Sequence, residues 1–348
     1  MSKPQPPPTL SVIIGVRNGA PHIRGCLECI YAQGLEPHTF EVIVADGLSE
    51  DGTREVIEHY IRHHHITNLC IIPNPRRTLA AAFNEALPQV RGDYMAKVDA
   101  QSRISPNYFR ALMAALERHP EVAVAGGRFE PCGDTRDSRT WAHVFSDPWL
   151  VGPAAYRYAD KEQYIDTVYL GMYRVNVAQQ VGPFDERLLR SEDTDFNYRI
   201  RQLGWKFLLV PSVSATYYVR QSYREAFQQF HGYAYYRYAF TEKHSLPLTV
   251  RQTGPLAVTL LALVMLIGAT WTWPVMLAGI LFYGAIYGWR TRKGTRGSLM
   301  DSVRVFLMYP TVQLGYIAGS VRYMVRRQGG WYRNEKGSEK GRSRVQNP

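Results

Sequence analysis

Residues 94–101 have the sequence Tyr94-Met95-Ala96-Lys97-Val98-Asp99-Ala100-Gln101. The apolar run at residues 94–98 predicts a buried parallel strand, which delivers Asp99 to its carboxyl end, where open α/β sheets bind ligands. About ninety residues further on, Ser191-Glu192-Asp193 opens a segment of helical periodicity. An Asp at a strand end is often a turn residue, and a Glu-Asp pair often satisfies free N–H groups at a helix start. In combination, the two segments predict a metal-bound diphosphate at Asp99 that faces a carboxylate base.

The first hundred residues repeat one structural unit. Short β-branched runs alternate with stretches of helical periodicity at Leu10–Val16, Phe40–Ala45 and Leu69–Ile72. This alternation predicts a doubly wound, mostly parallel α/β sheet. The second run leaves through a glycine-containing turn, Asp46-Gly47-Leu48-Ser49-Glu50-Asp51-Gly52-Thr53. The chain lacks Gly-x-Gly-x-x-Gly after its first strand and lacks a P-loop motif, which argues against the dinucleotide and P-loop classes.

These segments resemble the family 2 glycosyltransferases with a GT-A fold over roughly residues 9–240. Val44–Thr53 is similar to the family's donor motif, V-V-D-G-x-S-x-D-G-T, and Asn74–Asn84 lies where a basic, Asn-containing segment precedes the metal motif. Within the family, the likeness is greatest to succinoglycan-type glucosyltransferases, membrane enzymes that extend a lipid-linked sugar. The resemblance implies a GT-A catalytic domain followed by a helical membrane region.

The resemblance also implies a site for a nucleotide-sugar, UDP-linked by expectation. The implied donor-binding residues are Asp46 at the nucleobase, the backbone near Val16, Arg17 and Asn18, and Arg76 or Arg77 at the diphosphate, with Asp99 and Ala100 in the metal motif. Taken alone, Asp46 is also a common turn residue, and two adjacent arginines are more often a solvated face.

The metal motif departs from the family pattern. The general pattern is Asp-x-Asp, and the succinoglycan-type enzymes often have Asp-Ala-His, whereas Gln101 occupies the last position here. Mg²⁺ or Mn²⁺ near Asp99 would stabilise the charge of the departing diphosphate. The neutral amide oxygen of Gln101 is a weaker ligand for a hard cation, so we expect low metal affinity at this position.

Asp193 is the implied general base. A carboxylate there takes the proton of the acceptor hydroxyl as the hydroxyl attacks the anomeric carbon from the face opposite the leaving group, which inverts the configuration. Glu192, Gln221 and Arg224 are the expected acceptor or supporting residues. Polymerising relatives carry Gln-x-x-Arg-Trp, whereas this chain has Gln221-Ser222-Tyr223-Arg224-Glu225 without the Trp.

The sequence therefore favours transfer of a single sugar to a lipid-linked saccharide. A processive polysaccharide synthase is the second interpretation. A catalytically weak membrane scaffold of GT-A fold is a third, and it is suggested by Gln101.

The composition changes after Gly254. Residues 255–271 and 274–289 contain no charged residue and are each about seventeen residues long, near the lower limit for crossing a bilayer. We expect two membrane spans joined by an interfacial turn, with a buried hairpin of a soluble domain as the alternative. Residues 303–321 contain Pro310 and fit a kinked span, a re-entrant pair or an interfacial helix; we favour a segment that does not cross.

Charge placement orients the predicted membrane region. From Arg290 to the C-terminus, 13 Lys/Arg face 3 Asp/Glu, so this stretch carries +10 of the formal net charge of +11. Basic residues that abut an apolar run stay cytoplasmic and meet anionic lipid, which favours a membrane over nucleic acid as the partner. We expect a multi-pass protein of the cell (inner) membrane with a cytoplasmic catalytic domain.

The expected organisation follows from these segments. It comprises a disordered tail at 1–8, a catalytic domain at 9–217, an amphipathic linker helix at 218–250, membrane-associated helices at 255–325 and a basic tail at 326–348. The aromatic residues between Tyr217 and Phe240 fit a protein core or a surface for headgroups and sugars about equally.

Overall fold

The computed structural model describes residues 7–146, 155–220, 222–250 and 299–327, with isolated positions between 252 and 282. The chain forms two compact units. The first comprises Met1–Cys132 and Pro153–Tyr218, and the second comprises Gly133–Gly152 and Val219–Pro348. The predicted catalytic domain was continuous over 9–217, whereas residues 133–152 group with the later part of the chain.

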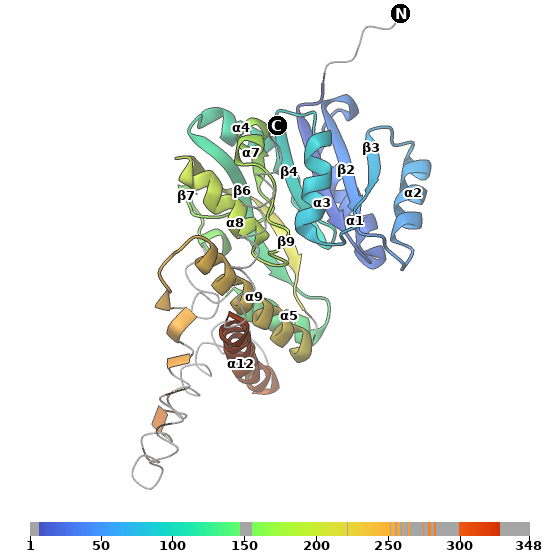
Figure 1. Ribbon diagram of the computed structural model, residues 1–348. Helices are drawn as coiled ribbons and strands as arrows, with labels where there is room; N and C mark the ends of the chain where they lie inside the picture. Colours follow the sequence, from blue (N-terminus) through green and yellow to red (C-terminus); the bar gives the residue numbers. More distant parts are fainter. Residues whose placement is uncertain are drawn as a thin grey trace, which may run out of the picture. The chain divides into compact units, whose positions relative to one another are not determined.

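The first unit contains a nine-stranded sheet with helices on both faces (Figure 1). Its strand order is β3 (Leu69–Pro73), β2 (Phe40–Asp46), β1 (Leu10–Val16), β4 (Tyr94–Asp99), β8 (Met172–Arg174), β6 (Val122–Cys132), β9 (Lys206–Tyr218) and β5 (Ser102–Ile104), with β7 (Gln163–Tyr164) paired to β9. Strands β1 to β4 are parallel neighbours, and β8 runs antiparallel between β4 and β6. The four predicted strands are confirmed.

The central strands are apolar without interruption because both faces of the sheet are covered. On β1, Val12 and Ile14 pack with one core cluster, and Ile13 packs with the other. The first cluster includes residues of α1 (Ala20–Tyr31), α2 (Thr53–His64) and α4 (Tyr108–Arg118), and the second includes residues of α3 (Leu79–Ala86), α7 (Val175–Val181) and α8 (Glu192–Gln202). Short 3₁₀ turns lie at Pro37–Thr39, Leu87–Gln89 and Ala155–Arg157.

Register brings three strand ends together at the carboxyl edge of the sheet. Val16 of β1 is paired with Asp46 of β2, and Gly15 of β1 is paired with Asp99 of β4. A Cβ atom at Gly15 would lie 2.6 Å from Leu79 Cδ1, so only glycine permits this approach of α3 to β1. This edge is where the predicted donor-binding residues gather.

The second unit contains α5 (Arg136–Phe145), α9 (Tyr223–Lys243) and α12 (Leu299–Arg327). Helix α12 packs closely on α9 because Gly315 and Gly319, four residues apart, have no side chain at the contact. A Cβ atom at Gly315 would lie 2.7 Å from the Phe227 carbonyl oxygen, and one at Gly319 would collide with the His231 carbonyl. Phe230, Tyr235, Tyr238 and Phe240 of α9 are buried, so these aromatic residues belong to the protein core.

The predicted linker helix at 218–250 is shorter than expected. Strand β9 continues through Tyr218 because Tyr217 and Tyr218 pair with Pro131 and Cys132 of β6, which satisfies their backbone groups in the sheet. Helix α9 begins only at Tyr223, where the Ser222 hydroxyl accepts a hydrogen bond from the Glu225 N–H at 3.2 Å. The helix ends at Lys243.

Within the described residues, no helix is long and apolar enough to cross a membrane. Helix α12 is one continuous helix with Pro310 inside it, so residues 303–321 do not form a re-entrant pair. The predicted spans at 255–271 and 274–289 lie outside the described residues, apart from isolated positions. The same is true of most of the N-terminal and basic tails.

Candidate active site

Three loops at the carboxyl edge are tied together by hydrogen bonds. One carboxylate oxygen of Asp46 accepts from the Ser49 hydroxyl at 2.6 Å and from the Ser49 N–H at 3.2 Å. The Ser49 hydroxyl accepts from the Asn18 N–H at 2.9 Å, and the Asn18 side chain accepts from the Glu50 N–H at 2.9 Å. Asn18 adopts a left-handed backbone conformation with φ 53°. The predicted donor residues Val16, Arg17, Asn18 and Asp46 are therefore adjacent, and Asp46 both shapes its turn and has a second oxygen available to a ligand.

The segment after β3 joins the same edge. The Asn74 N–H donates to the Asp46 carbonyl at 2.8 Å, and the Asn74 side-chain oxygen is buried without a hydrogen-bond partner in the described residues. Arg76 forms ion pairs of 2.7 Å with both Glu85 and Glu186. Arg77 is exposed. Arg76 must leave two carboxylates to reach a diphosphate, so Arg77 is the more accessible of the two predicted phosphate ligands.

Asp99 ends β4 and is held by a short chain of hydroxyl groups. Tyr169 donates to one Asp99 carboxylate oxygen at 3.1 Å, and the Ser102 and Tyr169 hydroxyls are 2.5 Å apart. Burial raises the pKa of Asp99 above its ordinary value, and the nearby Asp193 carboxylate raises it further. A cation beside Asp99 would favour its ionised form. Tyr169 lies in a loop, and no pattern in the sequence predicts its contact with Asp99.

The residues present fit a divalent cation that is shared with a ligand. In the described part of the chain, no group of three or more His, Cys, Asp or Glu side chains is arranged to hold a metal ion. Asp99 has one carboxylate oxygen free of protein hydrogen bonds, and Gln101 is only partly buried beside it in sequence. Mg²⁺ is commonly held by one or two protein oxygens, several waters and substrate phosphates, so this small set suffices only when a phosphorylated ligand supplies the rest.

Glu192 and Asp193 open α8 on the other side of the site. Glu192 is buried, and burial together with the adjacent Asp193 carboxylate raises the pKa of Glu192 to about 8. Asp193 is partly exposed, and one of its oxygens accepts from the Thr194 N–H at 2.7 Å. Because Asp193 also raises the pKa of Asp99, the two predicted catalytic carboxylates lie within electrostatic reach of each other.

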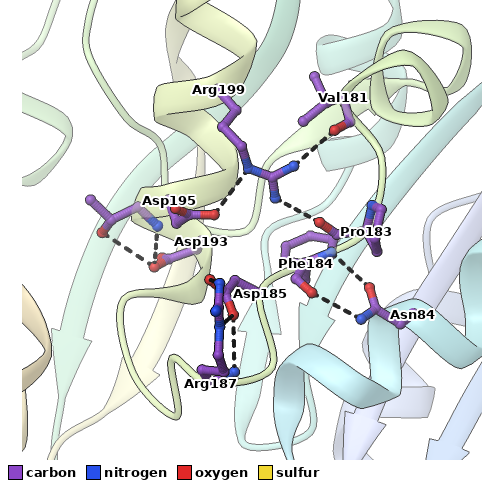
Figure 2. A network of polar contacts seen from close by, with 10 residues as sticks. Asn84, Val181, Pro183, Phe184, Asp185, Arg187, Asp193, Asp195 and Arg199 are labelled. Atoms are coloured by element: carbon purple, nitrogen blue, oxygen red, sulfur yellow. Dashed lines mark hydrogen bonds and ion pairs between the residues drawn. The ribbon is translucent and has the colours of Figure 1, made fainter. Parts of the chain in front are cut away.

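The loop between α7 and α8 leads into this pair and is fastened at two points (Figure 2). The Asn84 side chain on α3 accepts from the Phe184 N–H at 2.8 Å and donates to the Phe184 carbonyl at 3.0 Å. Both backbone groups of Phe184 are therefore satisfied by one side chain. Arg199 on α8 pairs with the fully buried Asp195 at 3.0 Å and donates to the Val181 and Pro183 carbonyls at 2.8 and 2.7 Å. The Asn84 contacts join segments a hundred residues apart in the sequence, and the Arg199 contacts join the loop to the helix that follows it.

Two predicted acceptor or supporting residues, Gln221 and Arg224, belong to the second unit. Gln221 lies outside the described residues, and Arg224 is exposed on α9 in the second unit. Ala100 follows Asp99 in the turn between β4 and β5 and packs against the core. Asn84, Asp195 and Arg199 were missed as positioning residues, although Asp195 and Arg199 have the i, i+4 spacing of a helical ion pair.

Comparison with known proteins identifies the family. The family model described as glycosyl transferase family 2 matches residues 11–182. This chain is 26% identical to the succinoglycan biosynthesis protein ExoA of Rhizobium meliloti over 72% of this chain and 76% of that protein. The chain belongs to glycosyltransferase family 2. The glycosyltransferase acts in the biosynthesis of a polysaccharide or another glycoconjugate.

Two further relatives are informative. The glycosyltransferase is 26% identical to the dolichyl N-acetyl-alpha-D-glucosaminyl phosphate 3-beta-D-2,3-diacetamido-2,3-dideoxy-beta-D-glucuronosyltransferase of Methanococcus voltae, over 63% of this chain and 70% of that protein. The mannosyltransferase PcManGT of Pyrobaculum calidifontis, solved with GDP-Man and Mn²⁺, has a similar fold with a TM-score of 0.56 and 18% identity over 91% of this chain and 87% of that one. The GT-A-like α/β fold predicted from the sequence is thereby confirmed.

The raised pKa of Glu192 predicts a pH-dependent stability of the glycosyltransferase. In the folded protein, Glu192 keeps its proton up to about pH 8. In the unfolded chain, a glutamate has its ordinary pKa of 4.5 and loses the proton near pH 4.5. Between these values the native state binds more protons, so the free energy of unfolding falls as pH rises. Glu192→Gln removes this loss. We expect its melting temperature to match the wild type at pH 4.5 and to exceed it by several degrees at pH 8.5.

Glu162→Gln is the matched control, because Glu162 is exposed and pairs with Arg118 at 3.1 Å on the surface. Scanning calorimetry from pH 4.5 to 9 measures both variants. A Glu192→Gln variant whose melting temperature tracks the wild type at every pH would contradict the assigned pKa.

Proposed function

We propose that this glycosyltransferase moves one sugar from a UDP-linked donor to a lipid-linked saccharide, with inversion of configuration. The observation that carries the proposal is the meeting of two carboxylates, Asp99 and Asp193, at the edge where the donor loops are fastened together. One carboxylate ends a strand beside the loops of Asn18 and Asp46, and the other begins a helix across the site. A donor and an acceptor need such opposed groups.

Asp193 is suited to act as the base. Its carboxylate is partly exposed and keeps one oxygen beyond the Thr194 contact, so an acceptor hydroxyl can reach it. The hydroxyl loses its proton to Asp193 and attacks the anomeric carbon on the face opposite the diphosphate. Glu192, protonated below about pH 8, adds no second negative charge beside the base at neutral pH.

Asp99 and Gln101 would hold Mg²⁺ or Mn²⁺ together with the donor diphosphate. The bound cation would supply positive charge to the leaving group. The protein groups have their own roles: Tyr169 orients the Asp99 carboxylate, and the turn at Asp46 and Ser49 shapes the nucleotide pocket. The Mn²⁺ bound in the similar mannosyltransferase structure supports this assignment.

A donor screen tests the proposal. The purified full-length chain is incubated with UDP-glucose, UDP-galactose, UDP-N-acetylglucosamine and GDP-mannose, and release of nucleotide is measured with and without Mn²⁺. We expect release from one UDP-sugar that depends on the divalent ion. Release from GDP-mannose alone would contradict the UDP assignment, and no release from any donor would favour the scaffold interpretation.

One relative and the exposed face of α12 support the lipid-linked acceptor. The Methanococcus voltae relative is named for transfer to a dolichyl-phosphate-linked sugar. In this chain, the side of α12 away from Gly315 exposes Leu307, Leu314 and Val321 at intervals of seven residues, followed by Val325. Arg322 and Arg326 are exposed at the same end. An apolar stripe beside basic residues suits the surface of an anionic bilayer, where a lipid-linked acceptor is presented.

We further propose that residues 255–289 cross the membrane twice, with the first unit and the C-terminal tail in the cytoplasm. Single cysteines introduced at Thr272 and Ser343 in a cysteine-free background test this arrangement with a membrane-impermeant thiol reagent. Thr272→Cys is expected to react in intact cells and Ser343→Cys only after lysis. Labelling of Ser343→Cys from outside would show an odd number of crossings.

A further inference from the structure

One buried lysine lies on the strand that ends at Asp99. Lys97 is on β4 two residues before Asp99, so both side chains project from the same face of the sheet. The residue is only 8% exposed. Its ammonium nitrogen lies 4.4 Å from the ring centre of Phe83 on α3 and 5.1 Å from that of Phe184. Within the described part of the chain, the Lys97 ammonium makes no side-chain hydrogen bond or ion pair, while the Lys97 backbone N–H donates to the Gly171 carbonyl at 3.1 Å.

The aromatic cage around Lys97 is itself held in place. Phe184 is the residue whose N–H and carbonyl are both bonded by Asn84, and its ring stacks on Phe196 of α8 with centroids 4.0 Å apart. Rings that hold a cation by their faces stabilise it by less than the burial of an ammonium costs. The two rings therefore fix the position of the ammonium, but they do not offset the full free-energy cost of its burial.

The carboxylates of the site supply the remaining stabilisation that the buried ammonium needs. Lys97 shares one face of β4 with Asp99, and its ammonium lowers the pKa of Glu192 against the burial that raises it. It acts over more than ion-pair distance, which is effective only where water is excluded. Asp193 raises the pKa of Glu192, so negative charge gathers beside this cation once Glu192 is ionised.

We infer that Lys97 is a positioning residue of the active site: its caged ammonium is the fixed counter-charge that lets Asp99, Glu192 and Asp193 converge in one pocket. The role assigned to the lysine in transfer rests on the proposed function. If Lys97 has this role, loss of its positive charge lowers both activity and stability because the carboxylates lose their counter-charge. Removal of the Glu192 carboxylate should then restore part of the stability. A lysine that merely fills space would show neither effect.

Lys97→Met tests the inference because methionine keeps the length of the side chain and its contact with aromatic rings while removing the charge. We expect kcat to fall about tenfold or more with less than about a threefold change in the donor KM, because Lys97 supports the carboxylates and lies away from the nucleotide loops. The matched control is Lys206→Met. Lys206 also lies over a ring, 4.5 Å from the centre of Tyr164, but is exposed and away from the three acids, so its loss should leave kcat unchanged.

A double-mutant cycle separates charge from packing. At pH 8.5, denaturant unfolding should show Lys97→Met less stable than the wild type, and Glu192→Gln should stabilise Lys97→Met by more than it stabilises the wild type. Additive effects of the two substitutions would overturn the inference. If Lys97→Met does not fold, folding of the double variant supports the counter-charge, and failure of both overturns it.

The unfolding cycle does not depend on transfer. Strong coupling in a chain that turns over no sugar donor would support the counter-charge and refute the proposed function. Turnover in the wild type with equal kcat in Lys97→Met would refute the role of Lys97 alone.

Discussion

Asp193→Asn is expected to lower the transfer rate at least about a hundredfold, the smallest effect usual for loss of a general base. Asparagine keeps the shape of the side chain, and its amide oxygen can still accept the Thr194 N–H bond that Asp193 makes at 2.7 Å. The start of α8 should therefore be preserved while the proton acceptor is lost. Turnover and calorimetric binding of the nucleotide measure the two properties separately, and nucleotide affinity should remain within about threefold of the wild type.

Asp166→Asn is the control for this substitution. Asp166 also lies in the first unit, but its side chain is 87% exposed and pairs with Arg201 at the surface, so its loss should leave turnover unchanged. Retention of more than about a tenth of the rate in Asp193→Asn would exclude Asp193 as the base, given the expected size of that effect.

Asp99→Ala is expected to abolish the enhancement of UDP binding by Mn²⁺. With Mn²⁺ present, the affinity for UDP should fall about tenfold or more, because Asp99 is the one carboxylate of the proposed cation site. Without metal, wild type and variant should bind UDP alike, since the loops of Asn18 and Asp46 do not depend on Asp99. Titration calorimetry with and without Mn²⁺ gives both affinities.

Substitution of Gln101 is expected to change metal binding in the opposite direction. Gln101→Asp adds the second carboxylate of the usual family motif and should raise the affinity for Mn²⁺ in the presence of UDP. UDP affinity that is indifferent to Mn²⁺ in the wild type, in Asp99→Ala and in Gln101→Asp would show that this edge of the sheet does not hold a metal.

Much of the fold follows from local sequence patterns. The runs ending at Val16, Asp46 and Asp99 are apolar and β-branched because both faces of the sheet are covered, and parallel strands place their carboxyl ends at one edge. Predicted strands therefore also predicted which loops would meet. The division of the chain into two units could not be predicted from local sequence patterns. Residues 133–152 join the second unit, and β9 extends through Tyr218, because of contacts with segments distant in the sequence.

The sequence by itself predicted Asp99 and Asp193 as the catalytic pair and Asp46 as the donor turn, since each belongs to a short motif whose chemistry depends on adjacent residues. The tertiary structure alone decided what surrounds them. Tyr169 is bonded to Asp99 across seventy positions, and Asn84 to Phe184 across a hundred. Lys97 gave only the signal of a charge in an apolar strand. Phe83 of its cage comes from α3, Phe184 from the loop before α8, and Glu192 and Asp193 from α8, because electrostatic compensation in a buried site depends on distance in space and not along the chain.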